Sequence, residues 1–469
     1  MLHQMIKNKL AARGPVCAGV IGAGDFGTVI VTQHRQIPGL EIPIVADVNA
    51  RAAQTALLEA GFGRDSVCYA GSAGQAERLI QDGKYVYTDR PEIMMDIPFI
   101  EIVCEGTGVP EAGARHCKMA IERRKHVAVI NKEVDSVIGP ILKKMAAEQG
   151  VVYTPVQGDQ HGLLLSLISW AKANGFTIVS AGKARDVEFI LEEQARTVSV
   201  SWEGITGQEW ETAHLSDADM GWFAPIPQGM EAEYIRRRAG LLKKLPQTGD
   251  FDLCELTIMA NHTGLRPANP RTNGGYLRIT EVPQVYCEKK HGGIYPQEGM
   301  LDAFACLRRR EDAGMDGGVY VVVKSGNPFS QGYLSRRGTL LNGDRSCTML
   351  YRPFHLCGME VADTIFGAVL LCVGCDGEEY LPRYDLVKTA ARDIEAGEEF
   401  GGDHDEKLAG MIVPATHYAP DAEVPGHLLD GNRALVDIPQ GAVITYSQVA
   451  EPEESLLWQL RRRQEADFK

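Results

Sequence analysis

The stretch that decides the fold is residues 16–27, which read VCAGVIGAGDFG. It joins a short apolar run to Gly22-x-Gly24-x-x-Gly27, the pattern of a strand–turn–helix in a dinucleotide-binding βαβ unit. In such a unit the first glycine permits a tight turn, the second lets the backbone approach a pyrophosphate, and the third lets the helix pack on the strand. The diphosphate then lies at a helix N-terminus. The cofactor-binding residues predicted here are Gly22, Gly24, Asp25, Phe26 and Gly27.

The segment that follows places an acid where a ribose would bind. Residues 28–36 fit a helix, and residues 42–46 read as a second buried strand that ends at Asp47, twenty residues beyond Gly27. An acid at this position hydrogen-bonds the ribose 2′-hydroxyl of NAD and repels the 2′-phosphate of NADP. Arg51 is four residues further on and is the candidate to bind such a phosphate. The local pattern therefore predicts ribose contacts and leaves both cofactors open.

The same alternation of strand, loop and helix continues further along the chain. Residues 100–104 read as a strand and lead into Glu105-Gly-Thr107-Gly108-Val-Pro, and a helix and the strand 127–130 follow, ending at Asn131-Lys132. This alternation is typical of a doubly wound parallel sheet. Ligands of such sheets bind beyond the carboxyl ends of the strands. We therefore expect Thr107, Gly108 and Asn131 to face the cofactor.

Length and pattern predict an α/β protein with three domains. Of the 469 residues, the segment 1–150 is predicted to form a Rossmann-type nucleotide-binding domain with a doubly wound parallel sheet. The segment 151–380 is predicted to form a central α+β domain for catalysis and dimerisation. Residues 381–469 contain two short strand–turn units with glycine turns, which predict a small β-rich domain.

Charge and cysteine content exclude several classes of partner. The formal net charge of −14 argues against a nucleic-acid-binding surface, which requires clustered cations. The longest uncharged apolar run, residues 364–375, is too short to cross a membrane as a helix. The eleven cysteines are an odd number and lie in apolar segments, which favours reduced thiols. We expect a cytoplasmic protein with no nucleic-acid and no membrane partner.

The second domain contains the other candidates for chemistry. Lys183 and Arg185 follow the predicted strand 177–181 and offer a point charge and a planar fork for a phosphate or carboxylate, or else form an exposed strand end. Asp159 precedes an apolar helix and is either an N-cap or a metal ligand or proton acceptor. His161 is more typical of a structural residue. These residues do not define a complete set of metal ligands.

Three further segments have simpler interpretations. Residues 351–356 line a substrate pocket through Arg352 and His355, or else form a core between domains. Cys372 and Cys375 have redox-motif spacing, but their apolar flanks favour buried core thiols. The cluster at residues 461–463 is predicted to be a solvated helix end.

The chain resembles the homoserine-dehydrogenase-like oxidoreductases that carry a C-terminal SAF domain, and the resemblance covers nearly its whole length. It rests on the glycine fingerprint and on six further motifs. These are residues 105–110 (EGTGVP), 129–133 (VINKE), 158–160 (GDQ) and 351–356 (YRPFHL), with 391–398 and 438–441 matching the SAF module. The best-known members of this architecture are the 1-deoxy-D-xylulose 5-phosphate reductoisomerase-like enzymes.

The resemblance implies NADP(H), a divalent cation (Mg²⁺ or Mn²⁺), a small phosphorylated substrate and a homodimer. It also implies an active-site role for Lys132, and the other catalytic candidates are Asp159, Lys183 and Arg185. The main hypothesis is an NADPH-dependent reductoisomerase that makes 2-C-methyl-D-erythritol 4-phosphate. Residues 182–186 (GKARD) depart from the glycine-lysine-glycine segment of those members. The alternatives are therefore an NAD(P)-dependent oxidoreductase of another aldehyde, keto acid or polyol, and a non-catalytic sensor of cofactor or sugar.

Overall fold

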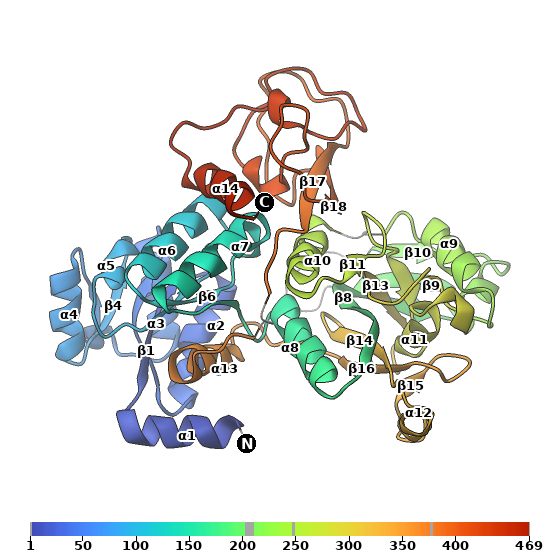
Figure 1. The fold of residues 1–469 in the computed structure, drawn as a ribbon, viewed down its shortest axis with the longest axis horizontal. Coiled ribbons are helices and arrows are strands. Elements are labelled where there is room, and N and C mark those ends of the chain that lie inside the picture. Colours follow the sequence, from blue (N-terminus) through green and yellow to red (C-terminus); the bar gives the residue numbers. More distant parts are fainter. Residues whose placement is uncertain (1, 202–210, 246–248, 376–378, 469) are drawn as a thin grey trace. The chain divides into compact units, whose positions relative to one another are not determined.

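The computed structural model describes residues 2–201, 211–245, 249–375 and 379–468, and the decisive stretch forms β1 and the start of α2. β1 is the central strand of a seven-stranded sheet with the order β3-β4-β2-β1-β5-β6-β7. Every pairing in this sheet is parallel. Helices flank the sheet, as Figure 1 shows. The predicted doubly wound α/β class is confirmed.

The strands of this first sheet are β1 (Val16–Ile21), β2 (Leu40–Ala46), β3 (Val67–Tyr69), β4 (Tyr85–Thr88), β5 (Ile102–Glu105), β6 (His126–Val129) and β7 (Tyr153–Pro155). The helices are α1 (Leu2–Arg13), α2 (Asp25–Gln33), α3 (Ala50–Glu59), α4 (Ala73–Gln81), α5 (Glu92–Met95), α6 (Pro110–Glu122) and α7 (Lys132–Gln149). β1 has a nearly continuous apolar sequence because both of its faces are covered.

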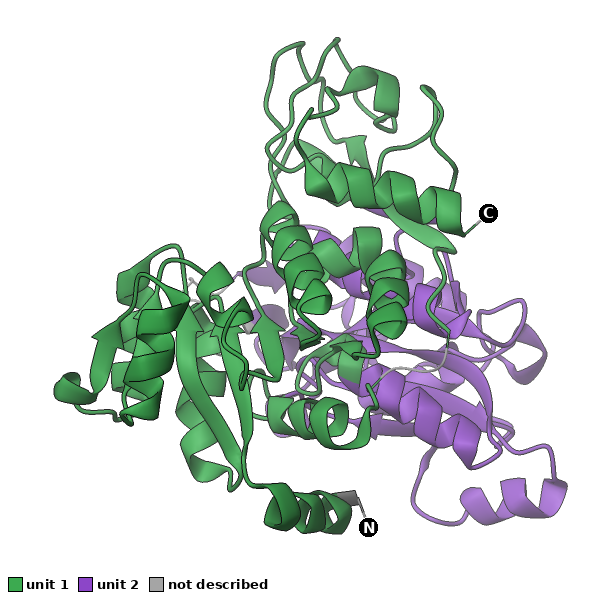
Figure 2. Ribbon diagram, turned by 60° about the vertical axis from the view of Figure 1, so that its left-hand side comes forward, with its two compact units in different colours: residues 1–162, 356–409, 414–469 green, residues 163–355, 410–413 purple. Residues whose placement is uncertain are grey.

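The chain divides into two compact units, which Figure 2 colours separately. Unit 1 contains residues 1–162, 356–409 and 414–469, and unit 2 contains residues 163–355 and 410–413. Unit 1 therefore combines the parallel sheet with most of residues 356–469, which are called the C-terminal segment below. The predicted boundaries at residues 150 and 380 stay a prediction.

The C-terminal segment contains α13 (Val361–Phe366), β17 (Tyr384–Ala390), β18 (Leu408–Pro414) and α14 (Leu456–Asp467). Isolated antiparallel bridges, such as Thr389 with Val443 and Ile394 with Ile438, connect its loops. This agrees with the predicted β-rich C-terminal part. Its apolar residues share a core with those of α6 and α7, which explains why the segment belongs to unit 1.

Helix α14 is fixed to α7 at a break in the α7 ladder. Pro140 lies inside α7, and the side chain of Gln464 bridges this point by accepting from Ile141 N at 3.1 Å and donating to Val137 O at 3.0 Å. Arg461 is buried and forms two hydrogen bonds of 2.6 and 2.7 Å with Asp385. The prediction of a solvated cluster is therefore wrong for Arg461, because the guanidinium is paired with a buried carboxylate.

Unit 2 is built on a nine-stranded mixed sheet. Its strands are β8 (Thr177–Glu192), β9 (Thr197–Ser201), β10 (Thr212–His214), β11 (Arg266–Pro267), β12 (Gly275–Leu277), β13 (Met300–Arg308), β14 (Val319–Lys324), β15 (Leu340–Leu341) and β16 (Thr348–Arg352). Its helices are α8 (Gln160–Ala173, which begins in unit 1), α9 (Glu231–Leu241), α10 (Asp250–Thr263), α11 (Val282–Val285) and α12 (Pro328–Leu334). β8 pairs with β13 in parallel and with β14 and β9 antiparallel.

Two further expectations can be compared with these elements. The predicted strand 177–181 is too short, because β8 continues to Glu192 through the sheet. Cys372 is exposed and adopts a left-handed conformation at φ 56°, so the prediction of buried core thiols is wrong for this residue. Within the ranges given above, the structure contains no helix long and apolar enough to span a membrane.

Candidate functional site

The glycine loop of unit 1 is shaped for a bound diphosphate. Gly22 adopts φ +93°, and a Cβ there would collide with Gly106 O. A Cβ on Gly27 would collide with Gly22 O, so α2 can approach β1 only with glycine at this position. A Cβ on Gly24, by contrast, would meet no atom within 4 Å. The backbone of Gly24 is therefore open to a ligand at the N-terminus of α2, which begins at Asp25.

Asp47 connects the end of β2 to this loop. Its Oδ2 accepts from Ala23 N at 2.8 Å, and its Oδ1 accepts from Asn49 N at 2.8 Å. These two bonds fix the carboxylate next to the glycine turn. Arg51, in the first turn of α3, is exposed and accordingly has room to move. The structure thus brings Asp47, and not Arg51, into contact with the loop.

The carboxyl ends of β5 and β6 bring together the predicted residues Thr107 and Asn131. Asn131 caps α7 by accepting from Val134 N at 3.1 Å, and its Nδ2 donates to Thr107 Oγ1 at 3.0 Å. Thr107 in turn donates to the buried carboxylate of Glu105 at 2.6 Å. Gly108 follows at φ +65°, with no atom within 4 Å of a Cβ placed there. This network fixes the loop at the carboxyl edge of the sheet, where ligands of parallel α/β sheets bind.

Lys132 is the first residue of α7 and is half-buried. The positive charge of its ammonium stabilises the Asp403 carboxylate of the C-terminal segment, and so do the charges of His427 and Lys388. Burial raises the pKa of Asp403, but the positive charges of His427, Lys388 and Lys132 hold it below its usual range. Lys388 Nζ donates to Asp403 Oδ1 at 2.8 Å. Lys132 is thus part of a charged cluster inside unit 1, and its catalytic role stays a prediction.

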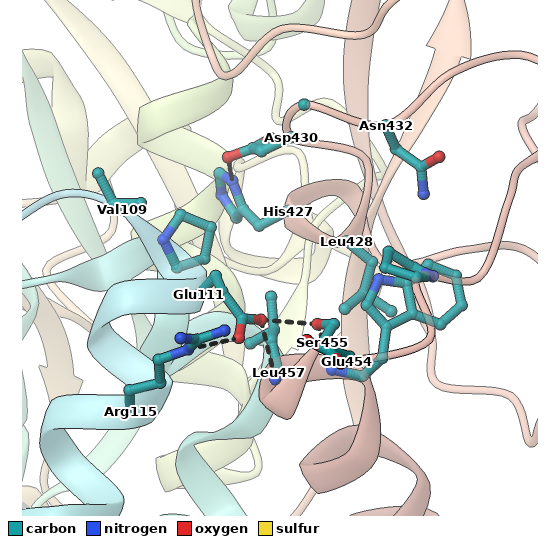
Figure 3. Close-up of a pocket in the computed structure, with 14 residues that line it drawn as sticks. Val109, Glu111, Arg115, His427, Leu428, Asp430, Asn432, Glu454, Ser455 and Leu457 are labelled. Carbon is teal, nitrogen blue, oxygen red and sulfur yellow. Dashed lines mark hydrogen bonds and ion pairs between the residues drawn. The ribbon is translucent and has the colours of Figure 1, made fainter.

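A cavity of about 380 Å³ lies between the start of α6 and the C-terminal segment, and Figure 3 shows its lining. The Glu111 carboxylate accepts from Ser455 Oγ at 2.6 Å, from the backbone at the start of α14, and from Arg115 Nε at 3.0 Å. Burial raises the pKa of Glu111, but these hydrogen bonds bring it below its usual value. The N-terminus of α14 is therefore occupied by a carboxylate of the protein.

Asp159 lies directly before α8. Its Oδ1 accepts from Gln160 N at 2.8 Å and lies 3.4 Å from Nδ1 of His161, whose side chain is buried. The structure places Asp159 directly before the helix and pairs it with a histidine. Its role as metal ligand or proton acceptor stays a prediction.

Lys183 and Arg185 occupy the interior of β8, so their predicted place at a carboxyl strand end is wrong. Lys183 Nζ lies 2.9 Å from Asp252 Oδ1 and 2.5 Å from Glu255 Oε2. The side chains of all three residues are at most 3% exposed. Because two buried carboxylates balance its charge, Lys183 does not present an uncompensated cation for a phosphate.

Helix α10 supplies both carboxylates. Asp252 lies in its first turn, accepts from Gly249 N at 3.2 Å, and is 3.4 Å from Arg185 Nε. Burial raises the pKa of Asp252, but the charges of Lys183 and Arg185 outweigh burial and lower it. Sequence reasoning missed Asp252 and Glu255. The available signal was the presence of two acids, three residues apart, in the apolar helix sequence DFDLCELTIMANHT.

Residues 248–361 match a family model described as the catalytic domain of oxidoreductase DRL. The matched segment contains α10 with its two acids, together with His355. No protein in the curated set matches the chain significantly. Most of the matched segment therefore lies in unit 2, and it includes the two acids of the buried charge cluster.

Several solved structures are also similar to the chain. A putative myo-inositol dehydrogenase from Sinorhizobium meliloti is 14% identical over 76% of this chain and 87% of that chain, with a TM-score of 0.33. A probable dehydrogenase from Thermotoga maritima is 12% identical over 76% and 90%, with a TM-score of 0.34. S. aureus homoserine dehydrogenase is 16% identical over 34% of this chain and 39% of that chain, with a TM-score of 0.22. The chain spans half or less of the first solved structures it matches, 50%, 43% and 39% of their lengths.

Proposed function

We propose that the protein is a nicotinamide-dependent oxidoreductase that interconverts a carbonyl group and an alcohol in a small molecule. The observation that carries the proposal is the loop at Gly22–Gly27, with open backbone at Gly24 and Asp47 fixed on Ala23 N. This loop fits the diphosphate, and Asp47 fits the adjoining ribose. When bound, the nicotinamide would supply or accept the hydride. The match of residues 248–361 to an oxidoreductase model supports the same chemistry.

The geometry of Asp47 favours NAD(H) over the NADP(H) that the family resemblance implies. Its carboxylate is fixed by two backbone N–H groups beside the loop, where it would repel a 2′-phosphate. Arg51 is exposed, and the Asp47 carboxylate contacts the backbone N–H groups of Ala23 and Asn49. We therefore expect NADH to bind more tightly than NADPH.

The buried cluster of unit 2 supports a role in handling the substrate oxygen. Lys183, between Asp252 and Glu255, is a fixed ammonium in a site of low dielectric, where a charge acts more strongly on a polarised carbonyl than it would in water. The compensated charge of Lys183 favours a carbonyl or hydroxyl ligand over a phosphate. This supports the oxidoreductase of an aldehyde, keto acid or polyol. The reductoisomerase needs a metal and a sugar phosphate and is therefore the less favoured hypothesis.

The test begins with binding. NADH and NADPH are titrated into the purified full chain while the quenching of tryptophan fluorescence is followed, with Asp47→Ala as the variant expected to lose NADH affinity. Turnover is then measured with aspartate semialdehyde, a panel of aldehydes, keto acids and polyols, and 1-deoxy-D-xylulose 5-phosphate with Mg²⁺ or Mn²⁺. Turnover of a non-phosphorylated substrate supports the proposal. Binding without any turnover would favour the sensor, and methylerythritol phosphate formation would establish the reductoisomerase.

A further inference from the structure

Strand β8 is interrupted by a bulge immediately after Ala184. In the pairing with β13, Phe304 lies opposite Ala184 and Cys306 lies opposite Glu188, so β8 advances from residue 184 to 188 while β13 advances from 304 to 306. At the same place β8 stops pairing with β14, whose last partner is Lys183, and starts pairing with β9 at Glu188. Bulges of this kind redirect side chains and are frequent beside active sites.

The bulge turns one side chain out of the core. Asp186 is the one residue of β8 between Ile178 and Leu191 that is not buried. The neighbouring loop is pinned to the bulge, since Gly317 N donates to Arg185 O at 3.2 Å and Ala184 N donates to Gly318 O at 2.8 Å. The sheet irregularity therefore holds Asp186 against the loop that contains Gly317.

Gly317 separates Asp186 from a histidine. A Cβ on Gly317 would lie 2.5 Å from Asp186 Oδ1 and would collide with Nδ1 and Cε1 of His355. Oδ1 of Asp186 and Nδ1 and Cε1 of His355 all lie within 2.5 Å of this Cβ position. The carboxylate and the imidazole are therefore neighbours beside Gly317. Gly317 has φ +65° and thus favours glycine on conformational grounds as well. Nδ1 of His355 has no hydrogen-bond partner among the residues that the structure describes.

The charges around this pair come from three elements. Burial raises the pKa of Asp186, and the carboxylates of Glu255 and Asp252 on α10 raise it further, whereas Lys183 on β8 and His355 lower it. Asp186 and His355 are both less buried than Lys183. The whole charge cluster consists of Lys183, Asp186, Asp252, Glu255 and His355. Within it, Asp186 and His355 are the more accessible residues.

We propose that His355 is the acid–base catalytic residue of the oxidoreductase and that Asp186 is its positioning residue. This inference rests on the proposed function. Nδ1 of His355 lies on the side of the ring that faces Gly317 and the Asp186 carboxylate, and Nε2 is left for the substrate. In reduction, the carbonyl carbon gains a hydride while the imidazolium gives its Nε2 proton to the carbonyl oxygen. The products are an alcohol, the oxidised nicotinamide and a neutral imidazole, and oxidation reverses each transfer.

The pair itself is tested without any substrate. Diethyl pyrocarbonate modifies neutral imidazole, so the modification of His355, followed by peptide mass spectrometry from pH 5 to 8.5, gives its titration midpoint in the full chain. Asp186→Asn removes the neighbouring carboxylate and should change the pH dependence of the modification of His355. Gly317→Ala, which inserts a methyl group beside both side chains, should also displace the midpoint. Gly338→Ala is the matched control, because Gly338 has φ +75° and no atom within 4 Å of its Cβ position.

The catalytic role is tested on whichever substrate the wild type turns over. His355→Asn should lower kcat by about 100-fold or more with KM little changed, and Asp186→Asn should lower kcat less while shifting the pH profile. Unchanged kcat in His355→Asn would overturn the catalytic role, and equal midpoints in the wild type and Asp186→Asn would overturn the pair. If the wild type turns over no substrate, the proposed function fails and the catalytic step with it. The modification midpoints still decide whether the pair exists.

Discussion

The glycine loop of unit 1 and the charge cluster of unit 2 are two different ways of building a site. In the loop, Gly22, Gly24 and Gly27 are close in sequence, and their backbone makes the binding surface. In the cluster, Lys183 meets Asp252 and Glu255 from a helix about seventy residues away. The first site depends on the absence of a Cβ at three positions. The second depends on opposite charges whose burial is compensated only when they are paired.

The largest expected effect tests the cluster. Lys183→Met removes the buried ammonium that Asp252 and Glu255 share, so the free energy of unfolding should fall by about 3–5 kcal/mol. Urea unfolding measures this fall. Lys172→Ala, at an exposed position of α8, should change stability by less than about 0.5 kcal/mol. If Lys183→Met matched this control, the cluster would not be the close-coupled unit described here.

A second effect of the interior concerns pH. Burial raises the pKa of Asp302 to about 6, although Asn273, Tyr295 and Ala303 N donate to its carboxylate. Because the folded pKa lies above the unfolded value, the favourable contribution is complete below the unfolded pKa and is lost as pH rises towards 6. The loss is on the order of 2–3 kcal/mol. The urea midpoint of the wild type should therefore contain a decrease between pH 4 and 7 that is absent in Asp302→Asn. If the midpoints of the two proteins changed equally with pH, the prediction would be contradicted.

The loop of unit 1 is tested by two alanine substitutions. Gly27→Ala places a methyl group against Gly22 O and should lower the free energy of unfolding by about 1–3 kcal/mol. The same change should also weaken NADH binding. Gly24→Ala meets no protein atom, so thermal unfolding should be nearly unchanged while NADH affinity, measured by fluorescence, falls about tenfold. A Gly24→Ala protein with wild-type NADH affinity would show that the diphosphate does not bind here.

The smallest expected effect concerns cofactor choice. Asp47→Asn removes the negative charge but keeps an oxygen acceptor, so the ratio of NADPH to NADH affinity should rise, by about tenfold or less. Arg51→Ala is the matched comparison, and because Arg51 is exposed its effect on either affinity should be smaller. A larger loss of NADPH affinity in Arg51→Ala would instead assign the phosphate contact to Arg51.

The sequence predicted unit 1 well because its signals are local. The turn at Gly22, the acid at Asp47 and the loops at Thr107 and Asn131 each follow from a strand end and a few neighbouring residues. Arg461 shows where local reasoning fails. Three consecutive arginines predict a solvated helix end, yet Arg461 pairs with Asp385, seventy-six residues away.

The sequence by itself determined the parallel sheet, its glycine loop and the acid beside it, because those depend on backbone conformation and on apolar runs that can be read from short segments. Only the tertiary structure decided which charges share the interior of unit 2. Lys183 looks like an exposed strand end in sequence, but β8 runs on to Glu192 and α10 covers it with two acids. Burial makes an isolated charge costly, so its partner is fixed by packing between distant segments, which a local pattern does not contain.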